Sequence, residues 1–471
     1  MTSSILIQNP LCCATMSENR PASDDINCFR GGHIFIENGK VKSFGSGTFS
    51  SSADRIIDAS RMVVLPGFVN THHHFFQTLT RNIFSTQTSQ LFDWLTTNYE
   101  IWRELTGEAV FISAKIAISE LLKSGCTTTS DHLYLFPKES QAGLIDSEIL
   151  AAQEMGMRFQ PTRGSMSLGK SKGGLPPDSV IQDEQTIVDD IRHLVKKYHD
   201  TSFGAMIRIS LAPCSPFSVT QELMKKTVEL AEEFNLQIHT HLAETIDEKT
   251  FCINQFGVRP FDYVKQAGWI RKNAWFAHAI HLNDAEIREM GEIGVGISHC
   301  PTSNMRLGSG IARISELLQA GANVSLGVDG SASNDSSNML MELRNALLLS
   351  RLRDQDKWLT VSDILWMATR GGANALGRDD IGEIAVGKCA DLILIDLDRV
   401  EYAGAQHDPL GAILFSIPLQ PVDYSIINGK IVVDQGKIVG LDESALIQRQ
   451  QEISDRMVES AEKRTGKRLR R

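Results

Sequence analysis

Short apolar runs alternate with helical patterns through the long middle of the chain, and this alternation limits the fold more than any other feature. A helical pattern over 109–123 stops at Gly125, and the β-branched run 127–129 follows it. Later strand candidates, several preceded by a helix-like stretch such as 220–234, are 207–212, 237–241, 274–279, 296–299 and 324–329. Repeated strand-then-helix units are typical of a parallel barrel, so we expect an α/β protein built on a (β/α)8 TIM barrel.

Both ends of the chain are instead rich in short strands and turns. Asn38-Gly39 stands between the apolar stretches 34–37 and 40–44, and such a pair favours a tight hairpin turn. Asn428-Gly429 gives the same pattern near the other end, so we expect the two ends to pair into one small β module. The predicted boundaries are 1–66 and 381–441 for this module, 67–380 for the barrel, and 442–471 for a polar helical tail that frays on the surface. Residues 82–107 and 164–183 are expected to be loops over the barrel mouth.

Composition excludes several classes of protein. The net charge of −10 argues against a general binder of nucleic acid or of anionic membranes. No stretch approaches the roughly 18 apolar residues that a membrane span needs, and the N-terminus lacks the positive region of a signal peptide. The eight cysteines form no CxxC pair, which fits reduced thiols. We therefore expect a cytoplasmic protein without a nucleic-acid or membrane partner.

Polar residues at the ends of the predicted strands are the candidates for chemistry, because barrel enzymes use the carboxyl ends of their strands. His72 and His74 follow an apolar run and share one side of a strand, whereas His73 points away. A lone pair of this kind is as often structural as metal-binding. Later strand ends carry further ionisable residues, namely His241, His278, His299 and Asp329. Their recurrence at successive strand ends favours a functional site over a purely structural explanation.

Four of these residues offer ligands for one divalent metal ion. They supply nitrogen and oxygen atoms suited to Zn²⁺ or Fe²⁺, and they are His72, His74, His241 and Asp329. A metal at such a site lowers the pKa of water to about 7. Glu244 could then shuttle a proton, and His278 could orient or polarise the water. The stretch 211–217 has no lysine to bridge a second ion, so we expect one metal per subunit.

Five motifs along the chain carry a family resemblance: PGFVNTHHH, HTHLAET, AHAIHL, SHCPTSN and GVDGSASND. With them, the chain from about residue 5 to 441 resembles the amidohydrolase superfamily, in its deaminase and chlorohydrolase branch. The resemblance implies a metal-dependent TIM barrel, most often with Zn²⁺, a β-sandwich built from both chain ends, hydrolysis of an aromatic C–N bond in a small heterocyclic substrate, and a homo-oligomer. It assigns the metal ligands to His72, His74, His241 and Asp329. It also makes Glu244 the proton shuttle, places His278 beside the water, and gives Asp329 a second role as a base.

Further stretches resemble the 8-oxoguanine deaminases within that branch, among them HHHFFQTLTR, LFDWL, TRGSMSLG and LAPCSPFSVT. This likeness implies loss of the 2-amino group of 8-oxoguanine to give urate and ammonia. Gln77 corresponds to a family position where an amide hydrogen-bonds the purine. An amide suits this role because it can donate and accept at once. The other candidates for substrate binding are His299, Asn304, Arg163 and Trp102, with core or surface roles as the alternative for the last two.

Two other interpretations stay open. The same chemistry could act on guanine, isoxanthopterin or a hydroxylated s-triazine, because a few hydrogen bonds in the pocket decide among such rings. A catalytically silent binding protein on the same scaffold is the alternative from another class. The complete ligand set and Glu244 argue against it, because a scaffold needs neither.

Overall fold

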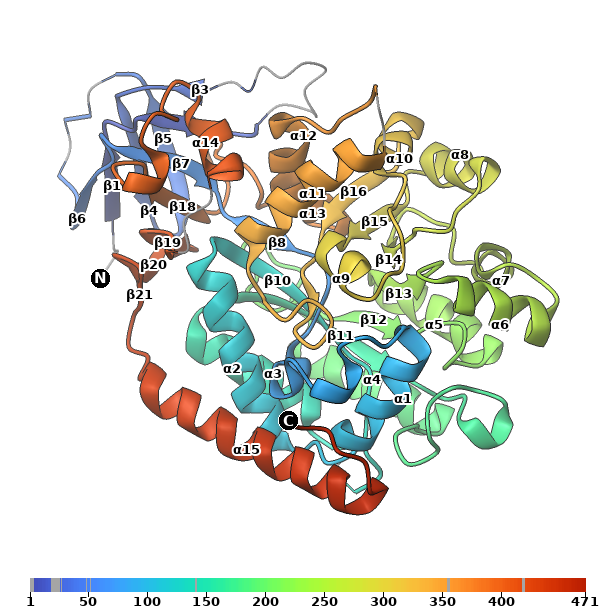
Figure 1. Cartoon of the computed structure of the whole chain (residues 1–471). Helices are drawn as coiled ribbons and strands as arrows, with labels where there is room; N and C mark the ends of the chain where they lie inside the picture. The colour runs from blue at the N-terminus through green and yellow to red at the C-terminus, as the bar shows by residue number, and fades with distance from the viewer. Residues whose placement is uncertain are drawn as a thin grey trace.

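Eight parallel strands close into a barrel at the centre of the protein, in a computed structural model that describes residues 4–17, 26, 28–47, 49–50, 52–139, 142–353, 356–416 and 420–471 (Figure 1). In barrel order these strands are β8 (Phe68–Asn70), β10 (Cys126–Leu133), β11 (Arg158–Ser165), β12 (Ser210–Pro213), β13 (Ile238–Leu242), β14 (Ala274–His278), β15 (Gly296–His299) and β16 (Asn323–Leu326). Strand β16 pairs with β8 and so closes the barrel. The predicted α/β class and TIM barrel are confirmed.

Helices connect the strands and cover the outside of the barrel (Figure 1). Many begin at a side-chain cap, as α5 does where Thr220 accepts the backbone N–H of Leu223. From the N-terminus they are α1 (Leu91–Trp102), α2 (Gly107–Lys123), α3 (Leu144–Met155), α4 (Glu184–Tyr198), α5 (Gln221–Phe234), α6 (Ile246–Phe256), α7 (Pro260–Gln266), α8 (Asp284–Ile293), α9 (Pro301–Arg306), α10 (Ile314–Ala320), α11 (Met339–Arg353), α12 (Val361–Trp366), α13 (Gly372–Ala375), α14 (Pro409–Phe415) and α15 (Glu443–Thr465).

The two chain ends meet in a pair of sheets beside the barrel (Figure 1). One sheet has the order β5 (Lys40–Gly45), β4 (His33–Glu37), β1 (Ser4–Gln8) and β6 (Arg55–Asp58). The other runs β21 (Lys437–Ile438), β20 (Lys430–Asp434), β19 (Tyr424–Ile427), β18 (Leu392–Asp396), β7 (Met62–Pro66), β2 (Cys12–Ala14) and β3 (Cys28–Phe29). Antiparallel pairing of β18 with β7 joins the ends as expected. Ile5, Ile36 and Leu394 belong to one buried cluster formed by both sheets. The exact domain boundaries stay a prediction.

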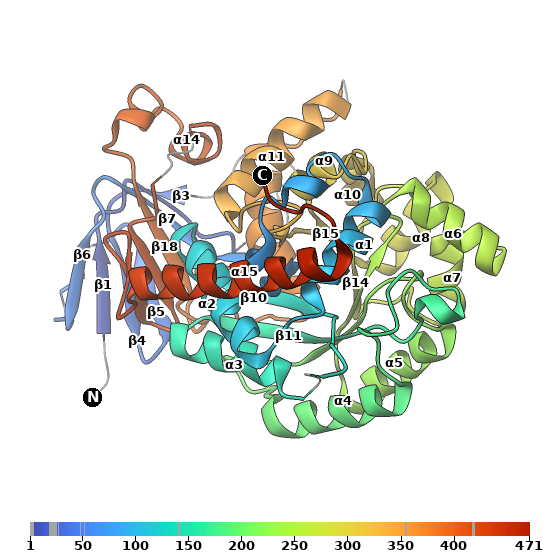
Figure 2. The ribbon, with the colours of Figure 1, turned by 60° about the horizontal axis from the view of Figure 1, so that its bottom comes forward.

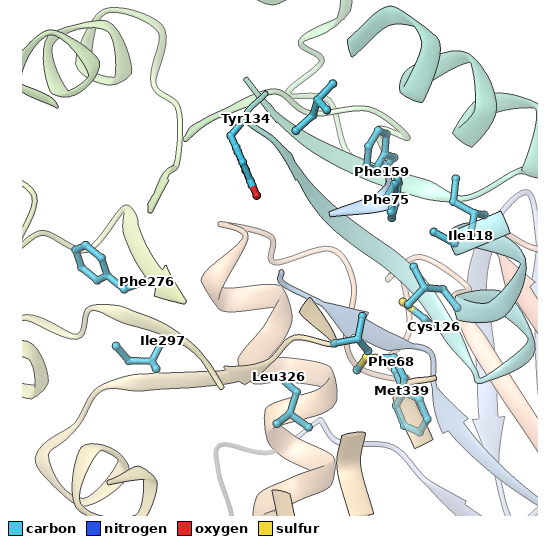
Figure 3. Close-up of a cluster of buried hydrophobic side chains, with 14 of the residues drawn as sticks. Phe68, Phe75, Ile118, Cys126, Tyr134, Phe159, Phe276, Ile297, Leu326 and Met339 are labelled. Carbon is cyan, nitrogen blue, oxygen red and sulfur yellow. The ribbon is translucent and has the colours of Figure 1, made fainter. Parts of the chain in front are cut away.

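Apolar side chains on the outer side of the barrel strands form the main core (Figure 3). Phe68, Phe159, Ile297 and Leu326 come from four different strands, and none of them is exposed to solvent. Ile118 of α2 belongs to the same cluster. Burial of one such side chain stabilises the fold by about 1.5–3 kcal/mol. This packing holds the strand ends, and the polar residues on them, in place.

Helix α15 and the residues after it lie across α2 and α1 (Figure 2). Ile453 and Met457 of α15 are buried, and Ser454 donates to the backbone oxygen of Leu79 at 2.6 Å. Beyond the helix, the backbone oxygen of Leu469 accepts the N–H of Phe84, and Leu469 is only 2% exposed. The tail is helical as expected, but the expectation that it frays is wrong, because apolar residues spaced along one face anchor the helix and Leu469 anchors its end.

The two predicted mouth loops differ in structure. Residues 82–107 contain η2 (Phe84–Thr86) and the twelve-residue helix α1, so this stretch is largely helical. Residues 164–183 begin with the last two residues of β11 and then contain only the short η3 (Lys170–Lys172). Strand β11 itself, next to this second stretch, was not among the predicted strands. Helix α1 matters for function, because it forms one wall of the pocket described next.

Candidate metal centre and pocket

A pocket opens at the carboxyl ends of the barrel strands. The polar and ionisable residues that line it include His74, Gln77, Glu244, His241, His278, Asp329 and Ser333. The other lining residues are Leu91, Trp94, Leu95, Tyr134, Cys214, Phe217 and Leu307. Small-molecule sites are commonly mostly apolar clefts with a few convergent polar groups.

Histidine nitrogens and one carboxylate converge beside this pocket. Nε2 of His74 lies 3.2 Å from Nε2 of His241 and 3.3 Å from Oδ1 of Asp329. Nε2 of His72 lies 3.4 Å from the same Asp329 oxygen. Strand β17 (Asp329–Gly330) pairs with β9 (His73–His74), which brings the first and last strand ends together. Four residues predicted from distant parts of the sequence thus meet at one point.

Backbone carbonyls fix the proton positions on two of these rings. Nδ1 of His74 lies 2.7 Å from the backbone oxygen of His132, and Nδ1 of His241 lies 2.7 Å from that of Cys214. A carbonyl oxygen only accepts, so both Nδ1 atoms carry the proton and both Nε2 atoms present lone pairs. Those lone pairs face each other at 3.2 Å, and they repel unless a cation or a proton lies between them.

A second imidazole fixes the proton on His72. His239 Nδ1 donates to the backbone oxygen of Trp275 at 2.8 Å, so its Nε2 is an acceptor. His72 Nδ1 donates to that Nε2, also at 2.8 Å. Nε2 of His72 is buried and has no hydrogen-bond partner among the described residues. Such outer hydrogen bonds orient the ligands of metal sites.

These distances fit a divalent ion. Zinc binds nitrogen and oxygen ligands at about 2.0–2.2 Å in tetrahedral geometry, which places neighbouring ligand atoms about 3.3–3.6 Å apart. The ligand-capable atoms of His72, His278 and Asp329 all lie within 4.8 Å of one another, and so do those of a second group comprising His72, His74, His132 and His241. The donor set therefore suits a metal, with His132 an addition that the sequence did not predict.

Burial sets the charge of these groups. It lowers the pKa of His72 well below its ordinary value and that of His241 to about 3, so both rings are neutral at pH 7. Burial alone would raise the pKa of Asp329, but the adjacent His72 and His74 rings hold it well below its usual range. Neutral imidazoles and an ionised carboxylate are the forms that bind a metal.

Glu244 and His278 stand beside this centre. Nε2 of His278 lies 3.5 Å from Oε2 of Glu244 and 3.8 Å from Oδ2 of Asp329. Burial raises the pKa of Glu244, the charge of Asp329 acts in the same direction, and together they bring it to about 8. A carboxyl group with a pKa near neutrality can take up and release a proton at working pH.

Left-handed backbone occurs where the strands end at the site. Ala243, His278 and Asp329 have φ of 51°, 71° and 62°, a region that non-glycine residues rarely adopt. Such strain persists only where the surrounding structure enforces it, and it is common at functional sites. At His278 the left-handed turn redirects the side chain at the end of β14 into the pocket.

The carboxylate of Glu248 holds the turn that carries Glu244. Its Oε1 accepts the N–H of Ala243 at 2.9 Å, and its Oε2 accepts the N–H of Glu244 at 2.7 Å. Both oxygens therefore fix consecutive amides of a strained turn. We expect Glu248→Gln to lower kcat about 10- to 100-fold with little change in KM, because an amide can replace only one acceptor and a small misplacement of a catalytic group is costly.

Steady-state kinetics of Glu248→Gln against Glu286→Gln checks this expectation. Glu286 also accepts a backbone N–H at a helix start, from Asn283 at 2.7 Å, but it lies outside the pocket lining. Its variant should keep the wild-type kcat. Equal kcat values for the two variants would contradict a positioning role for Glu248.

The predicted substrate-binding residues are placed differently from one another. Gln77 lines the pocket, whereas Arg163, His299 and Asn304 do not. Oδ1 of Asn304 lies 2.9 Å from Nδ1 of His278, so this residue reaches the site only through that ring. His299 instead lines a separate cavity with apolar residues of α10 and α11.

Arg163 is fully engaged inside the protein. Its guanidinium bonds to Asp190 at 2.6 Å and to Gln182 at 2.8 Å, and it lies 4.0 Å above the ring of Phe136. The structure therefore gives it a role in the core. Trp102 is the other candidate for which a core role was the alternative. It donates its indole N–H to Thr80 at 2.9 Å, and it does not line the pocket.

Several pocket residues were missed from the sequence. Trp94 lies in the stretch LFDWL, and with Leu91 and Leu95 it forms the i, i+3, i+4 pattern that marks one face of a helix. That pattern could have identified this part of the pocket wall from the sequence. Tyr134 and Cys214 line the pocket just beyond or near the ends of β10 and β12, so the strand-end rule could have found them.

Comparisons with known proteins agree with this geometry. Residues 63–432 match the model of the amidohydrolase family. An 8-oxoguanine deaminase from Pseudomonas aeruginosa is 49% identical over 420 residues, covering 89% of this chain and 93% of that protein. A hydroxydechloroatrazine ethylaminohydrolase from Pseudomonas sp. (strain ADP) is 36% identical over 83% of this chain and 82% of its own length. The solved structure of an atrazine chlorohydrolase from Arthrobacter aurescens complexed with zinc superposes with a TM-score of 0.89, at 30% identity, over 96% of this chain and 100% of that one.

Proposed function

The chain belongs to the amidohydrolase family and is a hydrolase acting on C–N bonds, and on that premise we propose that it deaminates 8-oxoguanine to urate and ammonia. The observation that carries the proposal is the 49% identity to an 8-oxoguanine deaminase over 89% of the chain. The geometry of the polar groups supports it, since ligand-capable atoms, Glu244 and Gln77 all lie around one pocket.

We propose His72, His74, His241 and Asp329 as the ligands of one divalent metal ion per subunit. Zinc is the favoured ion, because these nitrogen and oxygen donors suit it and because related structures contain it. Fe²⁺ is the alternative. A metal held there supplies a water of lowered pKa, about 7, and thus a nucleophile at neutral pH.

The residues around the centre have separate roles in the proposed reaction. Glu244 takes one proton of the water as it adds to the amino-bearing ring carbon and passes it to the ring nitrogen. Asp329 takes the second proton from the new hydroxyl and passes it to the leaving amine, and His278 orients the water through its Nε2. The amide of Gln77 hydrogen-bonds the ring. These steps break the C–N bond and release ammonia.

We place the enzyme in the cytoplasm, because all eight cysteines carry free thiols. Among the described residues, no helix has the length and hydropathy that crossing a membrane requires. A small heterocycle is the proposed partner, and homo-oligomerisation stays a prediction.

A substrate panel tests the proposed function. We expect 8-oxoguanine to give the highest kcat/KM among purines, pterins and hydroxy-s-triazines assayed for ammonia release, with a metal count on the same sample. Relatives that act on a triazine make the panel necessary. Higher kcat/KM for guanine, isoxanthopterin or a triazine would replace the proposed substrate, and metal-loaded protein without activity on any ring would favour the silent binding protein.

A further inference from the structure

Two buried carboxyl groups near the end of the first barrel strand take no part in the proposed reaction. They belong to Asp131 on β10 and Glu148 on α3, and neither residue is exposed to solvent. Oδ2 of Asp131 and both side-chain oxygens of Glu148 find no hydrogen-bond donor elsewhere in the described part of the chain. A buried polar group without a partner destabilises the folded state, so the pair needs a physical explanation.

A shared proton explains why both carboxyl groups are tolerated. Each side chain is the hydrogen-bond partner of the other, which requires that one of the two carboxyl groups carries a proton. Burial raises the pKa of both groups, and the charge of Asp131 acts in the same direction on the pKa of Glu148. Glu148 therefore holds the proton and donates it in a hydrogen bond to Asp131.

The other oxygen of Asp131 caps a short helix on the neighbouring strand. Oδ1 of Asp131 accepts the backbone N–H of Phe75 at 2.6 Å. Phe75 is the first residue of η1 (Phe75–Thr80), and His74 before it makes no side-chain cap to that helix. The carboxylate from β10 thus satisfies a helix-start N–H that the local sequence leaves without a cap.

The capped amide lies between two residues of the candidate site. His74 precedes it and directs Nε2 toward Asp329, and Gln77 follows it on η1 and lines the pocket. The ring of His74 is held by the next residue of β10, because its Nδ1 lies 2.7 Å from the backbone oxygen of His132. Strand β10 therefore fixes both the main chain and the imidazole at this corner of the site.

We infer that Glu148 is a positioning residue, which acts through Asp131 to fix the start of η1 and with it the metal ligand His74. Its proton occupies Oδ2 of Asp131 and leaves Oδ1 directed at the amide of Phe75. Without that donor, Oδ2 is buried and unpartnered, so the carboxylate loses its fixed orientation and the amide loses its cap. The inference rests on the proposed ligand set.

Hydrogen exchange in metal-free protein tests this chain of contacts. We expect Glu148→Leu, which removes the donor at similar volume, to speed exchange of the backbone amides of 75–80 by about tenfold. Glu148→Gln keeps an N–H donor and should stay within about threefold of the wild type. Ile149→Ala truncates an equally buried neighbour on α3 and should leave the exchange of 75–80 unchanged.

Zinc affinity, measured by competition with a chelator, gives the readout at the metal centre. Glu148→Leu should weaken zinc binding about 10- to 100-fold, because groups that orient metal ligands typically contribute that much to affinity. Glu148→Gln should restore binding to within about threefold of the wild type. Ile149→Ala should lower the Tm and keep the wild-type Kd, which separates positioning from a general loss of stability.

The outcomes separate the inference from the proposed ligand set. Unchanged exchange of 75–80 in Glu148→Leu overturns the inference, and so do equal effects of Glu148→Leu and Ile149→Ala on exchange and on zinc affinity. Glu148→Asp withdraws the carboxyl by one methylene and should show a smaller loss of both, so the decision does not depend on the folding of one variant. If His74→Ala binds zinc as tightly as the wild type, the ligand set is wrong, and the exchange data alone decide the role of Glu148.

Discussion

Glu244→Gln is expected to lower kcat by about 1,000-fold while the metal content stays at the wild-type level, because positioned acid–base groups typically contribute 10²- to 10⁴-fold to a rate. The amide fills the same space beside His278 but cannot accept a proton from water. Elemental analysis and ammonia release on one preparation measure both quantities. Full activity in this variant would remove Glu244 from the mechanism.

In metal-free protein, the free energy of unfolding of the same variant should depend less on pH than that of the wild type. Burial raises the pKa of Glu244 from 4.5 to about 8, so between these values the folded state holds a proton that the unfolded state has released. Stability from this group is fully present below pH 4.5 and is lost as the pH rises through 8. Urea unfolding at pH 5.5 and pH 8 should therefore show a smaller loss of stability in Glu244→Gln than in the wild type. Equal losses would mean that Glu244 is not buried as the structure has it.

The barrel was predictable because several of its strands are short apolar runs that alternate with helical patterns. Strand β11 was missed because its sequence, RFQPTRGS, contains a proline and five polar residues and so lacks an apolar run. Arg163 lies on this strand. Without the strand there was no alternation from which to infer that its side chain points to α4, where Asp190 binds it.

The site could be predicted as far as the position of a residue on a strand determines where its side chain points. His72, His74, His241 and Asp329 meet as expected, and parity correctly turned His73 away, toward Ser337. Parity also explains His299. Its neighbour Ser298 faces the barrel interior, where Thr71 donates to it, so His299 points outward to the helices. His278 escapes the same rule only because its left-handed backbone reverses it, which sequence patterns do not reveal.

The part of the pocket wall formed by α1 was harder to predict than the candidate ligands. The candidate ligands lie in short motifs, whereas Trp94 lies on a helix in a stretch expected to be a loop. Trp102 was the tryptophan proposed for substrate binding, and its indole N–H is bonded to Thr80. Only the fold distinguishes two tryptophans eight residues apart. Residues that line the pocket from a helix are for this reason less visible in a sequence than candidate ligands at strand ends.

His72→Ala should lose the metal and, with it, nearly all activity. The variant removes one of the nitrogens that converge on Asp329 and leaves His239 without its partner. Three of the four proposed ligands remain, among them His74 at 3.3 Å from Asp329, and the loss of the fourth lowers the affinity for the metal. Metal analysis after dialysis should find the wild type near one ion per chain and the variant near none.

A zinc titration measures the same loss of metal binding as a change in thermal stability. A ligand that binds only the folded state stabilises it by about 2.7 kcal/mol at 100 times its Kd, so added zinc should raise the Tm of metal-free wild type. His72→Ala should show no such rise. His299→Ala removes another fully buried imidazole, one that lines a separate cavity, and it should keep both the metal and the zinc-dependent rise. If His72→Ala retains a full complement of metal, then His72 is not a ligand, and the free lone pair on its Nε2 atom has another purpose.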